Sequence, residues 1–293
     1  MHPETGTGRP TLIVDVHAHL MDQHRDLDTT FVSQAAKAAG HDVDLSSHWD
    51  TYLSTSPPDT VAIVIGGKAR LSGIWVDDSA VSALVRTYPS RAIGFLSLDP
   101  TQPGWQDELR FGHEHLGLRG IKLMPMYAGF DPGSDLVRPL WRYASDHGLP
   151  VLMHTGTTFM SQAVLKYTRP VIADDIAREF PDLRLILAHL GHPYEGECLA
   201  VIRKHPNVFA DISALHYRPH QFWNALMLAQ EYGVWHKLLF GSDFPFTTVD
   251  DTIAELRRLA GIRMPGFGGL DGDQVDALIT RDALSLLGLS LEA

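Results

Sequence analysis

The sequence predicts a single-domain (β/α)₈ barrel. Short β-branched runs alternate with amphipathic stretches, a pattern typical of parallel strands joined by helices. The runs are apolar throughout, which indicates strands buried on both faces of the sheet. A length of 293 residues suits one such barrel. An open doubly wound sheet is the alternative, but no Gly-x-Gly-x-x-Gly motif follows the first strand, as dinucleotide-binding open sheets require.

Eight strands and eight helices are expected, each strand being followed by a helix. Each strand candidate ends in polar, glycine or proline residues, which are typical of loops. The expected strands are residues 12–16, 61–65, 92–96, 120–123, 150–153, 184–188, 208–212 and 237–240. The expected helices are residues 79–88, 105–116, 136–147, 172–180, 195–204, 221–232, 252–259 and 274–287.

Two segments stand apart from this alternation. Residues 1–10 are polar and rich in glycine and proline, so we expect a flexible N-terminus before a barrel that spans residues 11–293. Residues 21–60 form a long connection between the first two strands, with a helical stretch at 31–39. Because βα loops lie on the catalytic face of a barrel, this connection could act as a lid. An ordinary packing excursion explains it equally well.

Composition narrows the classes of function. The formal net charge of -11 argues against a nucleic-acid-binding surface, and no apolar run reaches transmembrane length. Cys198 is the only cysteine, so an intrachain disulfide is excluded and a reducing compartment is favoured. We therefore expect a cytoplasmic protein that acts on a small molecule and binds neither nucleic acid nor membranes.

The first expected strand leads into His17-Ala18-His19. Residues two apart on a strand point the same way, so these imidazoles should converge and form half of a metal site. The spacing alone is weak, because 16 histidines produce roughly one such pair by chance. His113-Glu114-His115 has the same spacing at the end of a helical stretch. We interpret that second pair as structural, at a helix C-terminus.

Chemically active side chains follow four other strands. They are Lys122, His154, His189 and Asp243. In a barrel the strand ends meet at one mouth. Each residue alone has a structural explanation, as a buried hydrogen-bonded histidine, a helix cap or a lysine reaching solvent. Together with His17 and His19 they predict a metal site.

Three imidazoles and one carboxylate would hold one divalent ion and leave a position open for water or substrate. The predicted ligands are His17, His19, His154 and Asp243. His189 would then serve as a general acid or base, and Asp243 could also take a proton. Zinc fits this nitrogen and oxygen set best, whereas manganese and iron are not excluded by ligand type.

These residues resemble the amidohydrolase superfamily, and most closely its amidohydrolase-related branch, which includes aminocarboxymuconate semialdehyde decarboxylase. The motifs that carry the likeness are Asp15-Val16-His17-Ala18-His19, Gly120-Ile121-Lys122-Leu123, Leu152-Met153-His154-Thr155-Gly156, Ala188-His189-Leu190-Gly191 and Gly241-Ser242-Asp243-Phe244-Pro245. The resemblance implies the same four metal ligands and a His189 that does not bind the metal. It also implies a homodimer as one possible state of assembly. Binuclear members of the superfamily use a carbamylated lysine, for which Lys122 is the candidate here, but the branch implies a mononuclear site.

Two reactions share this set of residues. A metal-activated water could hydrolyse an ester, lactone or amide, or the metal could anchor an unsaturated or aromatic carboxylate for decarboxylation. We favour the hydrolase because the sequence shows no arginine cluster that would clamp a carboxylate. A non-catalytic binding barrel is a third alternative. Expected substrate contacts are Lys122, Arg25, His216 and Tyr127.

Overall fold

The computed structural model describes residues 12–291, so the flexible terminus expected at 1–10 lies outside the described residues. Eight parallel strands form one sheet and confirm the predicted barrel. In spatial order they are β1 (Ile13–His19), β2 (Thr60–Ile65), β5 (Ala92–Leu98), β6 (Ile121–Leu123), β7 (Val151–Met153), β8 (Leu185–Leu187), β9 (Val208–Asp211) and β10 (Leu238–Leu239). Spatial order follows chain order, as in a singly wound (β/α)₈ barrel.

The sheet closes where the last strand meets the first. The amide of Val16 donates to the carbonyl of Phe240 over 2.9 Å, and that of His19 donates to Phe244 over 2.8 Å. In the opposite direction, the amide of Asp243 donates to the carbonyl of His17 over 2.8 Å. The residues just after β10 are therefore bound directly to the histidine-bearing end of β1.

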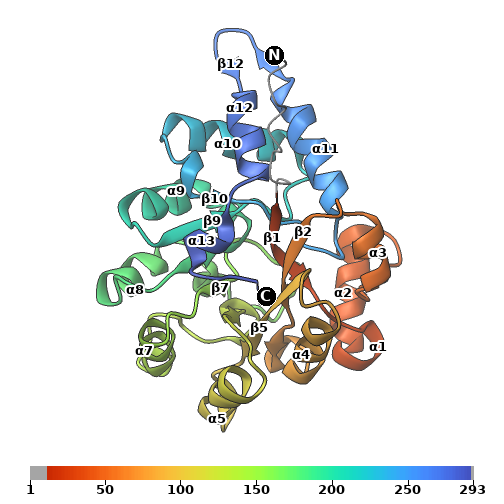
Figure 1. Cartoon of the computed structure of the whole chain (residues 1–293), viewed down its shortest axis with the longest axis vertical. Helices are drawn as coiled ribbons and strands as arrows, with labels where there is room; N and C mark the ends of the chain where they lie inside the picture. The colour runs from red at the N-terminus through yellow and green to blue at the C-terminus, as the bar shows by residue number, and fades with distance from the viewer. Residues whose placement is uncertain (1–11, 292–293) are drawn as a thin grey trace, which may run out of the picture.

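Helices surround the sheet on its outer side (Figure 1). The longer ones are α2 (Thr29–Ala39), α4 (Asp78–Thr87), α7 (Arg138–Asp146), α8 (Ile172–Glu179), α9 (Glu195–Lys204), α10 (Pro219–Glu231), α11 (Val249–Ala260) and α12 (Gly272–Ile279). The shorter ones are α1 (Gln23–Asp26), α3 (Trp49–Ser54), α5 (Trp105–Arg110), α6 (Pro125–Ala128) and α13 (Ala283–Leu287). Within the described residues, no helix combines the length and the apolar character needed to span a membrane.

Alternating side chains along the strands supply two separate apolar clusters. On β2, for example, Val61, Ile63 and Ile65 belong to the smaller cluster, whereas Ala62 and Val64 belong to the larger one. Every residue of β2 is buried. This burial on both faces is why the strands read as continuous apolar runs in the sequence.

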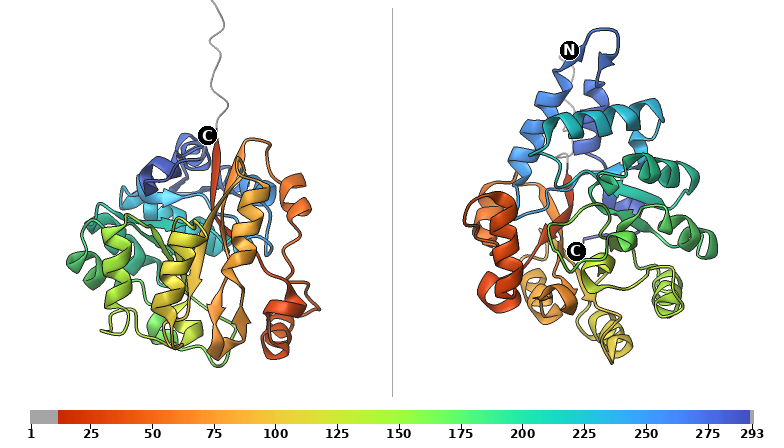
Figure 2. Two further views of the ribbon diagram at one scale, coloured as in Figure 1. Left: turned by 60° about the horizontal axis from the view of Figure 1, so that its bottom comes forward. Right: turned by 180° about the vertical axis from the view of Figure 1, so that it is seen from behind.

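Several elements differ from the sequence-based expectation. β1 continues through His19, so the histidine pair lies within the strand and not beyond it. The expected helix at 274–287 is two helices, because Asp282 caps a new helix with a hydrogen bond to the amide of Ser285. Two hairpins were not foreseen: β3 (Lys68–Ala69) with β4 (Ile74–Trp75), and β11 (Arg263–Met264) with β12 (Gly268–Gly269). The second projects beyond the barrel beside α11 and α12 (Figures 1 and 2).

The connection at 21–60 carries α1, α2 and α3. α3 packs on the barrel through Trp49 and Tyr52, whose rings stack 4.5 Å apart. The structure therefore shows an ordered, partly helical connection, and its action as a lid stays a prediction.

Candidate metal centre

The two histidines of β1 converge, as their spacing predicts. His17 Nε2 and His19 Nε2 lie 3.3 Å apart. The register between β1 and β2 shifts between Asp15 and Ala18. Such an irregularity changes the direction in which the side chains at this end of the strand point. His17 is fully buried and His19 nearly so, which puts the pair inside the mouth of the barrel.

Asp243 reaches this pair from the segment that follows β10, the strand next to β1 in the closed barrel. Its Oδ1 atom lies 3.4 Å from His17 Nε2 and 3.3 Å from His19 Nε2. The residue does not cap α11; that role belongs to the side chain of Thr248, which accepts from the amide of Asp251. The alternative explanation of Asp243 as a helix cap is therefore wrong.

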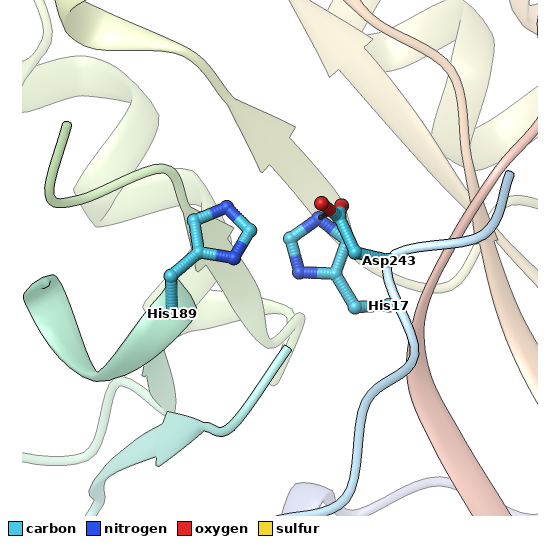
Figure 3. Close-up of side chains that lie close together, drawn as sticks. All are labelled: His17, His189 and Asp243. Carbon is cyan, nitrogen blue, oxygen red and sulfur yellow. Dashed lines mark ion pairs between the residues drawn. The ribbon is translucent and has the colours of Figure 1, made fainter. Parts of the chain in front are cut away.

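His189 stands beside His17 (Figure 3). The two rings stack with centroids 4.9 Å apart and an interplanar angle of 29°. His189 comes directly after β8, in the 3₁₀ turn Ala188–Gly191. Ligand atoms of His17, His189 and Asp243 all lie within 4.8 Å of one another, close enough to hold a metal ion.

His154 is also brought to the cluster, but its ring is oriented differently. Its centroid lies 4.9 Å from that of His189 and 5.0 Å from that of Tyr127. Its Nε2 atom lies 3.3 Å from the carbonyl oxygen of Thr157. If Nε2 donates to this carbonyl, Nδ1 is the nitrogen left for a metal.

Asp211, which the sequence analysis did not identify, contacts both His17 and His189. It is the last residue of β9 and is fully buried. Its Oδ2 atom lies 2.9 Å from His17 Nδ1, and its Oδ1 atom accepts from the amide of His189 over 2.9 Å. The sequence does contain one indication of this role, an acidic residue at the end of an apolar strand. A carboxylate buried there needs hydrogen-bond donors around it.

Lys122 is buried at the centre of the cluster. Its Nζ atom lies 3.1 Å from His17 Nε2. Burial lowers the pKa of Lys122 to about 8, while the charges of Asp211 and Asp243 oppose that shift. Burial therefore makes Lys122 easier to deprotonate than an exposed lysine.

Burial keeps the histidines neutral. It lowers the pKa of His19 and of His154 to about 3, and the charge of Lys122 adds to the effect. Burial likewise lowers the pKa of His17 and His189 well below the ordinary value. Metal-binding imidazoles must be neutral, so this environment favours the ligand form.

The backbone is strained at the same place. Asp243 and His189 have φ angles of 66° and 58°, and Ala214, after β9, has 60°. Residues other than glycine adopt this left-handed region at a cost of roughly 1 kcal/mol or more. Such strain clusters at functional sites, where the surrounding structure holds it in place.

The lone pairs of His17 and Asp243 face each other and favour a cation at this site. His17 Nδ1 faces the Asp211 carboxylate and donates to it, so His17 Nε2 carries a lone pair. That lone pair faces a carboxylate oxygen of Asp243 at 3.4 Å. Two acceptors this close need a positive charge beside them, which the ammonium of Lys122, 3.1 Å from His17 Nε2, or a divalent ion supplies. The donor set of imidazole and carboxylate fits zinc, manganese or iron.

Of the remaining predicted substrate contacts, Tyr127 lies beside the centre, whereas Arg25 and His216 line two other cavities. Tyr127 is buried against His154. Arg25 is exposed and pairs with Asp26 over 2.7 Å; it lines a cavity of about 610 Å³ beside α1. His216 lines a second cavity of about 450 Å³, which also includes Phe246, and its Nδ1 atom is buried without a hydrogen-bond partner.

The second pair with the His-x-His spacing lies elsewhere. His113 falls in a π-helical turn, Phe111–His115, that continues α5. Its Nδ1 atom lies 2.9 Å from the hydroxyl of Tyr143 on α7. This contact supports the interpretation of the pair as structural.

The sequence model of the amidohydrolase family matches residues 14–288. The chain belongs to the amidohydrolase family. This match spans nearly the whole barrel and confirms the resemblance, so this amidohydrolase is an enzyme. Among curated proteins, none matches it by sequence.

Solved structures of low sequence identity share the fold of this amidohydrolase. An uncharacterised TIM-barrel protein from Bordetella bronchiseptica has a TM-score of 0.69 at 17% identity, over 94% of this chain and 98% of that chain. A probable 2-pyrone-4,6-dicarboxylic acid hydrolase from Acinetobacter baumannii, with citric acid bound, has a TM-score of 0.66 at 17% identity, covering 94% and 99%. A 5-carboxyvanillate decarboxylase from Novosphingobium aromaticivorans, with bound manganese, has 0.66 at 15%, covering 98% and 99%.

Proposed function

We propose that this amidohydrolase is a metal-dependent hydrolase of a small ester, lactone or amide. The observation that carries the proposal is the convergence of His17 Nε2, His19 Nε2 and Asp243 Oδ1 within 3.4 Å of one another. The ring of His189 lies beside them as a group that can move a proton. A metal site next to a neutral base is the arrangement that hydrolytic metalloenzymes use.

His17, His19 and Asp243 would hold the ion, with His154 as the fourth ligand. Zinc is our first choice, since it favours imidazole and carboxylate in a four-coordinate site. Manganese is the second, and it is the metal in the Novosphingobium decarboxylase. When bound, a divalent ion would polarise a substrate carbonyl and stabilise the negative charge that develops on it. His189, held neutral by burial, would take a proton from the attacking water.

The cationic side chains that follow β2 argue for hydrolysis over decarboxylation. Lys68 pairs with Asp78 over 2.8 Å and with Glu108 over 3.1 Å. Arg70 stacks over the ring of Trp75 at 3.7 Å. These side chains are already engaged, whereas a substrate carboxylate is best held by a free arginine.

Decarboxylation is the second candidate, and Asp243 is the residue that favours it. Burial raises the pKa of Asp243 well above its ordinary value. In decarboxylation, Asp243 or His189 beside it would supply the proton that replaces carbon dioxide on the substrate carbon. The two candidates thus differ in whether the site takes a proton from water or gives one to carbon.

Metal analysis is the first test. Purified protein should contain about one divalent ion per chain, and His17→Ala should lower that content at least tenfold. His113→Gln changes the other pair with the same spacing and should leave the metal content unchanged. Equal metal loss in both variants, or none in either, would contradict the proposed ligands.

Turnover of a panel of lactones, esters, amides and aromatic carboxylates is the second test. Hydrolysis incorporates oxygen-18 from labelled water into product, whereas decarboxylation releases carbon dioxide. Asp243→Asn should abolish either activity while the protein stays folded. Carbon dioxide release without oxygen-18 uptake would replace the hydrolase proposal by the second candidate. A metal-loaded protein without turnover on any of these classes would contradict both candidate reactions.

A further inference from the structure

Asp211 accepts four hydrogen bonds, and Ser213 provides two of them. The amide of Ser213 donates to Asp211 Oδ1 over 3.1 Å, and its hydroxyl donates to the same oxygen over 2.5 Å. The amide of His189 is the third donor to Oδ1, at 2.9 Å. His17 Nδ1 faces the other oxygen, Oδ2, over 2.9 Å. Because backbone amides can only donate, Oδ1 must act as an acceptor. With the hydrogen of His17 on Nδ1, Oδ2 accepts as well, as in an ionised carboxylate.

The hydroxyl of Ser213 also touches the ring of His189. Its Oγ atom lies 2.7 Å from His189 Nδ1. A hydroxyl has one proton, and two oxygens 2.5 Å apart need a proton between them, so the Ser213 proton points to Asp211. His17 Nδ1, 3.3 Å from the same Oγ atom, then faces an acceptor as well. Towards His189 the Ser213 oxygen can therefore only accept, so the hydrogen must sit on His189 Nδ1.

We propose that Ser213 is a positioning residue that fixes the tautomer of His189, so that Nδ1 carries the hydrogen and Nε2 is the basic nitrogen. The assignment rests on the proposed role of His189 as the base. Asp211 sets both stacked imidazoles in the same form, His17 directly and His189 through Ser213. In both rings Nε2 then carries the lone pair, which is what a ligand and a neighbouring base require.

The surroundings of Ser213 make this contact specific. Serine 213 is fully buried, so no solvent competes for its hydroxyl. It follows β9 by two residues and precedes Ala214, whose φ of 60° turns the chain sharply. The backbone of His189 is anchored to the same carboxylate oxygen that receives the Ser213 proton. Ring and hydroxyl are therefore held by one acceptor, and their separation is fixed.

The test is a pair of variants with a spectroscopic readout. Nitrogen-15 shifts of the histidine rings distinguish protonated from bare nitrogens, and His189→Gln identifies the His189 signals. In the full-length zinc-loaded protein, His189 should show a hydrogen on Nδ1. Ser213→Ala should shift the ring to a mixture of tautomers or to the Nε2–H form. Ser213→Thr keeps the hydroxyl and should keep the original signature.

Kinetics give a second readout once a substrate is known. Ser213→Ala should lower kcat roughly 10- to 100-fold, the usual cost of removing such a supporting hydrogen bond, with KM and metal content little changed. Ser97→Ala is the matched control, because Ser97 is also fully buried near a strand end but its hydroxyl has no hydrogen-bond partner among residues 12–291. It should leave both the His189 signature and kcat unchanged.

Two results would overturn the assignment: an unchanged Nδ1–H signature in a folded Ser213→Ala variant, or a hydrogen on Nε2 in the unsubstituted protein. Loss of the signature in a folded Ser213→Thr variant would also count against it. The nitrogen-15 measurement needs no substrate. A failure of the hydrolase proposal, seen as carbon dioxide release or absent turnover, is therefore distinguishable from a failure of the Ser213 assignment.

Discussion

Asp15 on β1 binds Ser242, beyond β10, through both of its carboxylate oxygens. The amide of Ser242 donates to Oδ1 over 2.8 Å, and its hydroxyl donates to Oδ2 over 2.6 Å. The amide of His17 and the hydroxyl of Tyr52 donate to the same carboxylate over 3.1 Å. One buried side chain thus joins the strand of the histidine pair to the segment that carries Asp243.

Replacing Asp15 should destabilise the barrel where its first and last strands meet. In Asp15→Asn an amide NH₂ would face hydrogen-bond donors, and the loss of charged hydrogen bonds should cost about 3 kcal/mol. Tyr52→Phe removes only one donor to the carboxylate and should cost about 1 kcal/mol. Urea unfolding of the metal-free proteins measures both. An Asp15→Asn variant as stable as the unsubstituted protein would contradict this role.

Substitutions of His154 and His189 should have different effects on metal binding and on turnover. His154→Gln should lower the affinity for the divalent ion, by about 10-fold or more, because a predicted ligand is lost. His189→Gln should retain the ion and lose turnover, because the base is lost. Isothermal titration with zinc and steady-state kinetics on both variants provide the comparison. The opposite pattern would make His189 the ligand, as the grouping of His17, His189 and Asp243 also allows.

The metal-free protein should lose stability as the pH falls below 6.5. Burial lowers the pKa of His19 and His154 to about 3 in the folded chain, whereas an unfolded histidine titrates near 6.5. Between these values the unfolded chain binds more protons, so acid favours unfolding. Each ring should contribute up to about 3 kcal/mol of loss between pH 6.5 and 4.

Variants identify the source of this slope. In the presence of a chelator, His154→Gln should make the dependence of unfolding free energy on pH shallower. His220→Gln, at an exposed position on α10, should leave it unchanged. Equal slopes in all three proteins would show that the buried imidazoles do not cause the acid sensitivity.

Gly156, after His154, should not tolerate a side chain. Its φ is +99°, and a Cβ atom would lie 2.3 Å from the backbone oxygen of His192. We expect Gly156→Ala to cost about 3 kcal/mol or more, through strain and a backbone clash. Gly104→Ala is the control, since its φ is +82° but nothing lies within 4 Å; it should cost about 1 kcal/mol. Thermal and urea denaturation provide the comparison.

The sequence predicts the strands and much of the site because both depend on local pattern. Apolar runs mark the eight strands of the barrel, and the polar residues at their ends gather at one mouth once the sheet closes. Asp15 and Asp211 could not be placed in the same way. Their roles depend on partners that are far away in the chain, such as Ser242 and His17. The orientation of His154 towards the carbonyl of Thr157 is likewise a loop geometry that spacing does not specify.

The direct contact between the residues after β10 and the end of β1 bears on how the protein is made. During synthesis His17 and His19 leave the ribosome long before Asp243. The complete set of proposed ligands therefore exists only after Asp243 has been translated. Loading with metal would then follow assembly of the barrel and would not nucleate it.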